Sequence, residues 1–288
     1  MANNIALAKN FTAMLDEVYK WASVTNDLTS PSALIREGNT AKTIVYPQLD
    51  MNGLGDYDRN TGYVQNSITV DWKEAEFNYD RGSKIAVDVM DDEETKMIAF
   101  GRAAGELMRT KVAPEADAFT FATIAGTTGI SKAAAATLTK DTVLDALYES
   151  VVTMDEDEVP AEGRLLFITP TLRKSVVRLN TDVSREILDY FSGIIEVPQS
   201  RFYTAIDLLS GKDTEVAGGY QKNAEGKDIN FMVIEPSAII KWDKHVARDI
   251  IPAANNPDAD ADILKYRKYG IVDVFKNKVA GIYLHHKA

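Results

Sequence analysis

Few residues of this sequence have side chains suited to catalysis or metal binding, and their spacing supports neither task. The 288-residue chain has no cysteine, which excludes a thiolate nucleophile, a disulfide framework and a zinc knuckle. Of its three histidines, His285 and His286 are neighbours in a predicted strand, so they should point to opposite faces and cannot share a metal ion. The third, His245, lies in a basic stretch, and we interpret it as a surface or interface residue.

Carboxylates at alternate positions form the best candidate for a metal site. Asp258, Asp260 and Asp262 have the spacing that opens a calcium-binding loop. Such a loop also needs glycine at its sixth position and glutamate at its twelfth, where this chain has Ile263 and Tyr269. We therefore interpret the segment as a solvated acidic loop. Phosphate-loop, dinucleotide and Gly-x-Ser-x-Gly patterns are missing too, so the sequence predicts no catalytic, cofactor-binding or metal-binding residue and no enzyme.

The composition limits the class of protein. Apolar residues make up 45% and charged residues 26% of the chain, which is typical of a globular protein with one large or two ordinary domains. The net charge of −11 is the opposite of what binding to phosphates requires, so we expect no dedicated nucleic-acid binding. The first residues lack the pattern of a secretory signal, and no apolar run approaches the length of a membrane span.

An amphipathic segment near the start is set apart from the rest of the chain. In residues 4–21 apolar side chains recur at nearly helical spacing, and a polar, turn-rich linker comes after it over residues 23–31. The segment has two interpretations, a helix docked on its own domain or an arm that reaches a neighbouring chain. The residues expected to make its contacts are Phe11, Leu15, Val18 and Trp21.

Residues 40–90 are expected to be extended. Apolar and polar residues alternate in two runs, 42–49 and 68–73, with a loop rich in glycine, asparagine and aspartate between them. The pattern predicts a long hairpin with a polar tip and one apolar stripe. Because a two-stranded hairpin is marginally stable alone, the stripe must pack on its own domain or on a neighbouring subunit. The hairpin residues expected at such a contact are Ile44, Tyr46, Tyr57, Arg59, Ile68, Val70 and Trp72.

A long helix and a separate mixed module come next along the chain. The helix is predicted over residues 93–125, a rod of roughly 50 Å, in which Pro114 either causes a kink or begins a second helix. From residue 140 to residue 240, helices and short strands alternate at the spacing of an α/β or α+β module. Its helices are expected at 142–154 and 170–179, and its strands at 165–169, 194–197 and 231–234. After it we expect an acidic loop at 252–263 and strands at 271–275 and 279–285.

Four segments in the second half of the chain carry a resemblance to a known family. They are 164–172 (RLLFITPTL), 195–202 (IEVPQSRF), 230–238 (NFMVIEPSA) and 269–284 (YGIVDVFKNKVAGIYL). Together with the order of the elements, they resemble the Hong Kong 97-like capsid fold of tailed bacteriophages, over nearly the whole chain. The resemblance implies an α+β fold with an N-terminal arm, an extended β-hairpin loop, a spine-helix peripheral domain and an inserted axial domain. The implied boundaries are 1–33 for the arm, 34–82 for the extended loop, 83–139 for the peripheral domain, 140–240 for the axial domain and 241–288 for the returning peripheral strands.

The resemblance implies a major capsid protein, a structural subunit that self-assembles into an icosahedral shell around a DNA genome. Its main partner is then itself, in hexamers and pentamers, and a separate scaffolding protein and a portal are further expected partners. Neither sequence-specific nucleic-acid binding nor a membrane is implied. Assembly would take place in the bacterial host cytoplasm, and the product would be the virion capsid. The arm and the extended loop would lie on adjacent subunits, and the acidic loop with Asp258, Asp260 and Asp262 would lie where capsomers meet.

Two alternatives stay open at this point. An encapsulin-type nanocompartment shell protein has the same fold, but it packages a cargo enzyme and closes without a scaffolding protein. An uncharacterised α/β enzyme is the second alternative, and the missing catalytic site argues against it.

Overall fold

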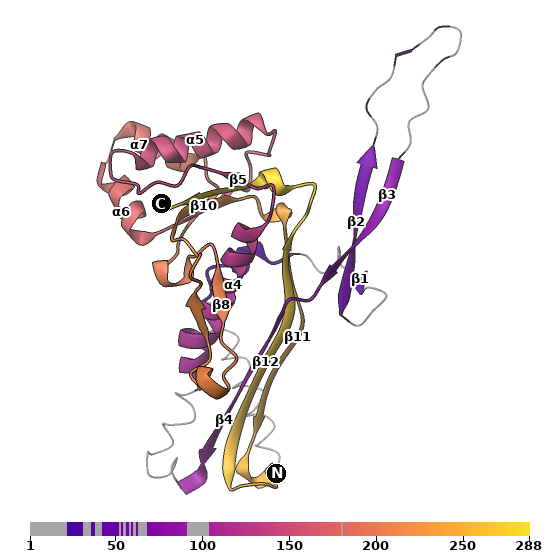
Figure 1. Ribbon diagram of the computed structural model, residues 1–288, viewed down its shortest axis with the longest axis vertical. Helices are drawn as coiled ribbons and strands as arrows, with labels where there is room; N and C mark the ends of the chain where they lie inside the picture. Colours follow the sequence, from indigo (N-terminus) through magenta and orange to yellow (C-terminus); the bar gives the residue numbers. More distant parts are fainter. Residues whose placement is uncertain are drawn as a thin grey trace.

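The computed structural model describes residues 22–30, 36–37, 42–51, 53, 56–57, 59, 62, 68–90, 104–179 and 181–288. Figure 1 shows an elongated molecule with a mixed helix and sheet layer at one end, a long three-stranded sheet running to the other end, and a hairpin that projects to one side. Over the described residues the strands form four sheets.

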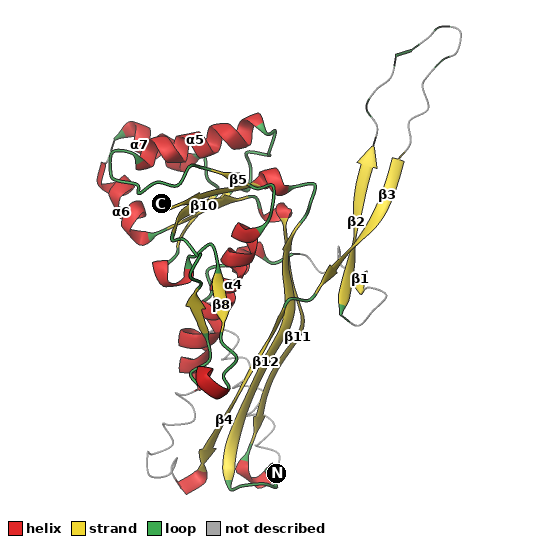
Figure 2. Ribbon diagram, viewed as in Figure 1, coloured by secondary structure: helices red, strands yellow, loops and turns green. Residues whose placement is uncertain are grey.

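A five-stranded sheet with strand order β5-β13-β10-β6-β7 forms the centre of the mixed layer. Its central strand β10 is buried at every residue, because helices cover both faces of the sheet (Figure 2). On one face, helices α5, α6 and α7 pack Leu147, Val176 and Ile187 against the strands. On the other face, Phe121 of α4 lies between Phe167 and Phe202, with ring centroids 5.2 and 4.8 Å away. The elements are β5 (Ser131–Lys132), α5 (Val143–Glu156), β6 (Leu165–Ile168), α6 (Pro170–Leu179), α7 (Asp182–Asp189), β7 (Gly193–Glu196), β10 (Ile229–Ile234) and β13 (Ile282–His286).

The predicted helices and strands of this module are confirmed, with boundaries that differ by a few residues at most. The last strand differs in its place. It was expected to return to the peripheral domain, whereas β13 pairs antiparallel with β10 and in parallel with β5. An apolar strand at the end of a chain can complete either sheet, and only the tertiary contacts select one of them.

The long sheet has the strand order β11-β12-β4 and is built from β4 (Tyr79–Asp88), β11 (Ile239–Ile251) and β12 (Ala261–Val274). At 3.4 Å per residue the 14-residue β12 is about 48 Å long. The predicted strand at 271–275 is therefore confirmed as the last part of β12, but the predicted loop to residue 263 was too long, since β12 already begins at residue 261. Lys265 and Arg267 are exposed while Leu264 and Tyr266 are buried, so the strand does alternate, but the buried Lys268 conceals the pattern.

A β-bulge interrupts the pairing of this sheet near the end at which β11 begins. The pairing of β11 with β12 shifts by one residue between Asp243 and His245. Gly270 lies opposite the bulge, where a Cβ atom would be 2.6 Å from the Asp243 Oδ1 atom and 2.8 Å from the Trp242 carbonyl oxygen. Glycine is therefore the residue that fits this position.

A helical run crosses the long sheet over residues 104–126. Within it a π-helical turn (Met108–Val112) precedes α4 (Ala113–Gly126), and Pro114 lies in the first turn of α4. The wider π-helical turn lets the chain pass a proline, which has no N–H to donate, without ending the helix. Ala104 and Met108 pack on Leu264 and Tyr266 of the sheet. The predicted rod is confirmed for this part, and residues 93–103 lie outside the described residues.

The predicted hairpin is confirmed. β2 (Thr43–Met51) and β3 (Ile68–Glu76) pair antiparallel, and β1 (Arg36–Glu37) adds a short third strand. A smaller finger of β8 (Ile206–Leu208) and β9 (Tyr220–Lys222) lies beside α4, on the side of the long sheet away from the hairpin (Figure 1). Short 3-10 turns complete the described chain: η1 (Asn26–Leu28), η4 (Gln199–Arg201), η5 (Asp213–Glu215), η6 (Pro236–Ala238), η7 (Ala253–Asn255) and η8 (Val279–Gly281).

Candidate functional site

The part of the chain that the structure describes contains no group of three or more histidine, aspartate or glutamate residues placed to hold a metal ion. The three aspartates of the acidic loop do not converge on one point. Asp258 and Asp260 are exposed, while Asp262 lies at the start of β12, where its Oδ1 atom accepts a hydrogen bond from the Ala253 N–H at 2.7 Å. Asp262 therefore stabilises the turn before β12. The loop lies at the far end of the long sheet (Figure 1).

The histidines are also separated from one another. His285 is buried, and its Nδ1 atom accepts a hydrogen bond from Asn230 Nδ2 at 3.1 Å, whereas His245 is exposed on β11. Burial lowers the pKa of His285 below its usual value. The Asn230 amide nitrogen also donates to the Ala136 carbonyl oxygen at 2.9 Å, so it acts as the donor toward His285. His285 is therefore a neutral core residue.

The two faces of the hairpin differ sharply in exposure. Ile44 and Tyr46 are 0% and 2% exposed and pack with Ile240 and Ile271 of the long sheet. The expectation that these two residues face a neighbour is corrected, because the chain's own sheet covers them. On the opposite face of the hairpin, Val70 is 52% exposed. Trp72 and Tyr57 are also exposed, at 50% and 60%.

Two further expected contact regions are only partly described. Arg59 is exposed, whereas the side chain of Ile68 lies outside what the structure describes. The arm residues Phe11, Leu15, Val18 and Trp21 also lie outside the described residues. The described chain begins at Ala22, and the residues immediately after it are fixed to the body of the molecule.

The segment after Ala22 is clamped to α4 by a buried carboxylate. Asp117 is 0% exposed and accepts hydrogen bonds at Oδ1 from the Ser23 and Thr25 hydroxyls, both at 2.7 Å. Its Oδ2 atom accepts from the Val24 N–H and from Arg201 Nη1, both at 3.1 Å. Four donors from two distant parts of the chain thus meet on one side chain, which orders the segment that was expected to be a linker. We call this hydrogen-bonded group of Ser23, Val24, Thr25, Asp117 and Arg201 the clamp.

A buried lysine continues this clamp. Lys241 Nζ donates to the carbonyl oxygen and to the hydroxyl of Thr25, both at 2.7 Å. Burial and, to a lesser extent, the nearby charge of Lys268 lower the pKa of Lys241 to about 8, while the charge of Asp117 acts in the opposite direction. Ser30, five residues after Thr25, also binds to β11, because its N–H donates a hydrogen bond to the Lys241 carbonyl oxygen at 2.9 Å. The segment therefore has two anchors on the body.

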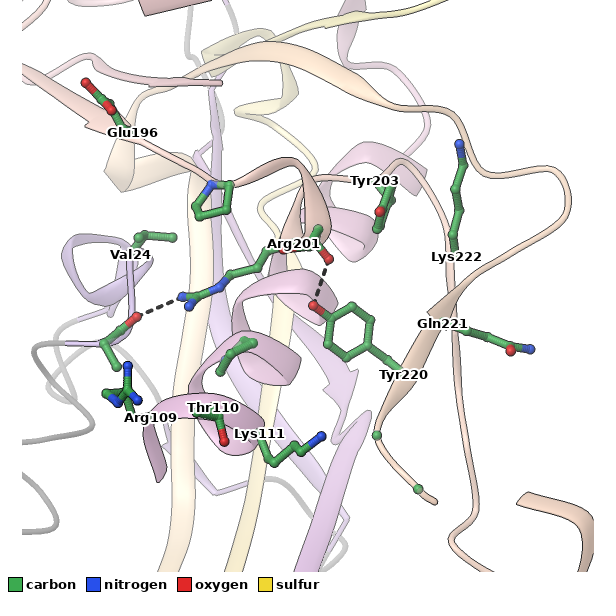
Figure 3. Close-up of a pocket in the computed structure, with 16 residues that line it drawn as sticks. Val24, Arg109, Thr110, Lys111, Glu196, Arg201, Tyr203, Tyr220, Gln221 and Lys222 are labelled. Carbon is green, nitrogen blue, oxygen red and sulfur yellow. Dashed lines mark hydrogen bonds between the residues drawn. The ribbon is translucent and has the colours of Figure 1, made fainter. Parts of the chain in front are cut away.

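An open groove lies beside the clamp (Figure 3). Its volume is about 890 Å³, and its walls come from the segment at Ala22, the helical run near Lys111, the η4 turn and β9. Among the described residues that line it, four side chains are cationic and one, Glu196, is a carboxylate. The cations are Arg109, Lys111, Arg201 and Lys222. The groove is thus locally basic in a chain whose net charge is −11.

Most of these cations already have partners. Arg109 pairs with Glu106 at 2.9 Å, Lys222 with Asp228 at 2.7 Å and Arg201 with Asp117. Lys111 is exposed and has no ion-pair partner among the described residues. Neither the clamp nor the groove was predicted from the sequence. One signal was available for the clamp, since Asp117 interrupts an apolar helical stretch on the side that faces the core.

Comparison with solved structures decides the fold. The mature capsid of bacteriophage PhiM1 matches with a TM-score of 0.62 at 12% identity, covering 92% of this chain and 87% of that chain. The capsid of the cyanophage P-SCSP1u matches with a TM-score of 0.55 at 14% identity, covering 88% of this chain and 85% of that chain. This chain has the Hong Kong 97-like capsid fold.

A third solved structure has nearly the same length. The virus-like particle from Pyrococcus furiosus matches with a TM-score of 0.54 at 15% identity, covering 97% of this chain and 99% of that chain. No protein-family model and no curated protein matches the sequence. Among the described residues, no helix is both long and apolar enough to cross a membrane.

Proposed function

We propose that this chain is the major capsid protein of a tailed bacteriophage, a structural subunit that self-assembles into an icosahedral shell around the DNA genome. The observation that carries the proposal is the shared fold with phage capsid structures over most of the chain. The hairpin supports it, because Val70 and Trp72 form an exposed apolar face on an element that projects from the body. Exposed apolar patches of this kind usually mark contacts with a partner.

The subunit works by assembly and not by catalysis in this proposal. The arm and the hairpin add weak contacts between neighbours, and closure of the shell multiplies their effect. Asp258 and Asp260, at the far end of the long sheet, contact neighbouring capsomers. A separate scaffolding protein and a portal assist assembly in the host cytoplasm, and the shell needs neither a cofactor nor a membrane.

Deleting residues 48–64 tests the proposal. The deletion leaves the buried pair Ile44 and Tyr46 in place, so the body should stay folded and soluble while shells no longer form. Shells are measured by negative-stain electron microscopy and by sedimentation, and folding by circular dichroism. Normal particles from the deleted chain would overturn the role of the hairpin, and a monodisperse monomer of the intact chain, even with its scaffolding protein, would overturn the proposal as a whole.

The nearly equal length of the virus-like particle from Pyrococcus furiosus favours one second candidate, an encapsulin-type shell protein. The two functions differ in what assembly requires. An encapsulin-type chain closes into uniform particles when expressed alone, whereas a phage capsid protein of this kind closes correctly only with its scaffolding protein. Expression with and without that partner, followed by microscopy, separates them.

A further inference from the structure

Residues 22–30, which we call the strap, lie on the body of the molecule with few apolar contacts. Leu28 is the only apolar side chain of the strap that is fully buried, and Val24 packs beside the same core. The clamp and Lys241 supply hydrogen bonds instead. Segments with few buried apolar contacts open at a lower free energy than the rest of a fold. The strap therefore has the properties of a unit that can open while the body stays folded.

The charged groups beneath the strap also favour opening. Asp117 and Lys241 are buried, and Arg201 Nη1 donates to the Ala22 carbonyl oxygen at 2.8 Å (Figure 3). Burial lowers the pKa of Lys241 to about 8, so the closed strap keeps an ammonium group in surroundings that disfavour its charge. Opening returns these charged groups to water, and that gain offsets part of the hydrogen bonding that is lost.

The two attachments of the strap differ in kind. The clamp, at residues 23–25, depends on buried charges, whereas the attachment at Ser30 is neutral. The Ser30 N–H donates to the Lys241 carbonyl oxygen at 2.9 Å, and its hydroxyl donates to the Ile239 carbonyl oxygen at 2.8 Å. The Lys241 N–H in turn donates to Ser30 Oγ at 3.0 Å. These three bonds fix Ser30 to the edge strand β11 without burying a charge, so they can persist when the clamp opens.

Opening of the clamp changes how far the N-terminal segment can reach. Residues 1–21 lead directly into Ala22, so with the strap closed their tether to the body begins at the clamp. With the clamp open the tether begins at Ser30 and gains the eight residues 22–29. Fully extended, eight residues span up to about 28 Å at roughly 3.5 Å each. The strap thus offers the N-terminal segment a short reach and a long one.

We propose that the strap is a two-position device, in which the clamp opens about a hinge at Ser30 while the body stays folded. This inference rests on the proposed shell function, in which the N-terminal segment contacts a neighbouring subunit. A shell of pentamers and hexamers places identical chains in several different environments. A tether with two lengths lets the same segment reach its neighbour in each of them.

Hydrogen exchange of the unaltered, unassembled chain tests the device. The N–H groups of Val24, Leu28 and Thr29 are hydrogen-bonded in the closed strap, so they should exchange together. Their exchange should be roughly 100-fold or more faster than that of Met232, in the buried strand β10. The Ser30 N–H should exchange more slowly than these three, because the hinge keeps its bond. Strap rates as slow as that of Met232, or a Ser30 N–H that exchanges with the other three, would overturn the device.

Removal of one hydroxyl tests the clamp itself. Thr25→Val keeps the shape of the side chain but removes the group that donates to Asp117 and accepts from Lys241. Exchange at Val24 should become roughly tenfold faster or more. Thr29→Val is the matched control, because Thr29 is an exposed residue of the same strap, and it should change exchange by no more than about twofold. Equal effects of the two substitutions would show that the clamp does not hold the strap closed.

Exchange in assembled particles separates this inference from the proposed function. In shells of the unaltered chain, peptides that contain residues 22–30 should show two populations, one with the strap closed and one with it open. A single closed population in well-formed shells would overturn the inference and leave the proposed function intact. Failure to form shells even with the scaffolding protein would overturn the proposed function, while opening of the strap is measured independently on the unassembled chain.

Discussion

Replacing Asp117 by asparagine tests the central feature of the clamp. The substitution keeps the shape of the side chain and removes its charge. In the best orientation the amide oxygen takes the place of Oδ2 and still accepts from the Val24 N–H and Arg201. The amide nitrogen then faces the Ser23 and Thr25 hydroxyls, which can turn and accept. Most hydrogen bonds can therefore be retained, and what is lost is the negative charge.

The loss of that charge determines the expected magnitude. The Arg201 side chain is 18% exposed and Lys241 is 5% exposed, so the substitution leaves Arg201 without its ion-pair partner and Lys241 without the strongest of the negative charges that act on it. Removing one partner of a buried ion pair costs about 3–5 kcal/mol. Asp80→Asn is a matched control, because Asp80 pairs with Arg267 through two hydrogen bonds but the two side chains are 46% and 57% exposed. Pairs of that kind contribute less than about 1 kcal/mol.

Urea unfolding of the unassembled chain measures both free energies, and hydrogen exchange of residues 23–30 shows whether the loss is local. We also expect a pH dependence. The negative charge of Asp117 raises the pKa of Lys241, so Asp117→Asn lowers that pKa further below about 8. The cost of the substitution should then shrink as the pH rises from 7 to 9 and the buried ammonium group loses its proton. A cost no larger than that of Asp80→Asn, or one that does not change with pH, would refute this reasoning.

Two further predictions concern the core. The pKa of His285 is lowered by burial, so the unfolded chain binds more protons than the folded chain once the pH falls through the ordinary value of 6.5, and stability should decline below that pH. Thermal unfolding between pH 5 and pH 8 measures the decline, which His285→Gln should reduce; an equal slope in that variant would contradict the assignment. Gly270→Ala should cost about 1–3 kcal/mol, since its Cβ atom would meet Asp243 at 2.6 Å. Gly105→Ala, which meets nothing within 4 Å in a helix, should be neutral or stabilising, and equal effects of the two would count against the bulge argument.

Local patterns were sufficient for the elements that have one clear periodicity. The alternation around Val70 and Trp72 predicted the hairpin strand, and the amphipathic pattern of residues 142–154 predicted α5. The same patterns failed where charged residues serve the fold. Lys268 is buried in β12 beside Asp243, with 2.9 Å between their charged atoms, although lysine is rarely buried.

The candidate surfaces divide in the same way. The sequence identified the hairpin as an apolar element in need of a partner, but it could not say which of its residues the chain itself would cover. Tertiary packing decided that Ile44 and Tyr46 lie against the long sheet while Val70 and Trp72 remain exposed. The reason is geometric, since a strand presents two faces of similar composition and only the approach of another element distinguishes them.

By itself the sequence determined that this protein has no thiol chemistry, carries a strong negative charge and contains the elements of a capsid-like fold in their order. Only the tertiary structure decided which groups meet. Ser23, Asp117, Arg201 and Lys241 are far apart along the chain, and their hydrogen bonds convert an apparent linker into a fixed segment. The basic groove has the same origin, because its walls come from four separate parts of the chain. Spacing along a sequence carries local periodicity, whereas contacts of this kind depend on how whole elements pack together.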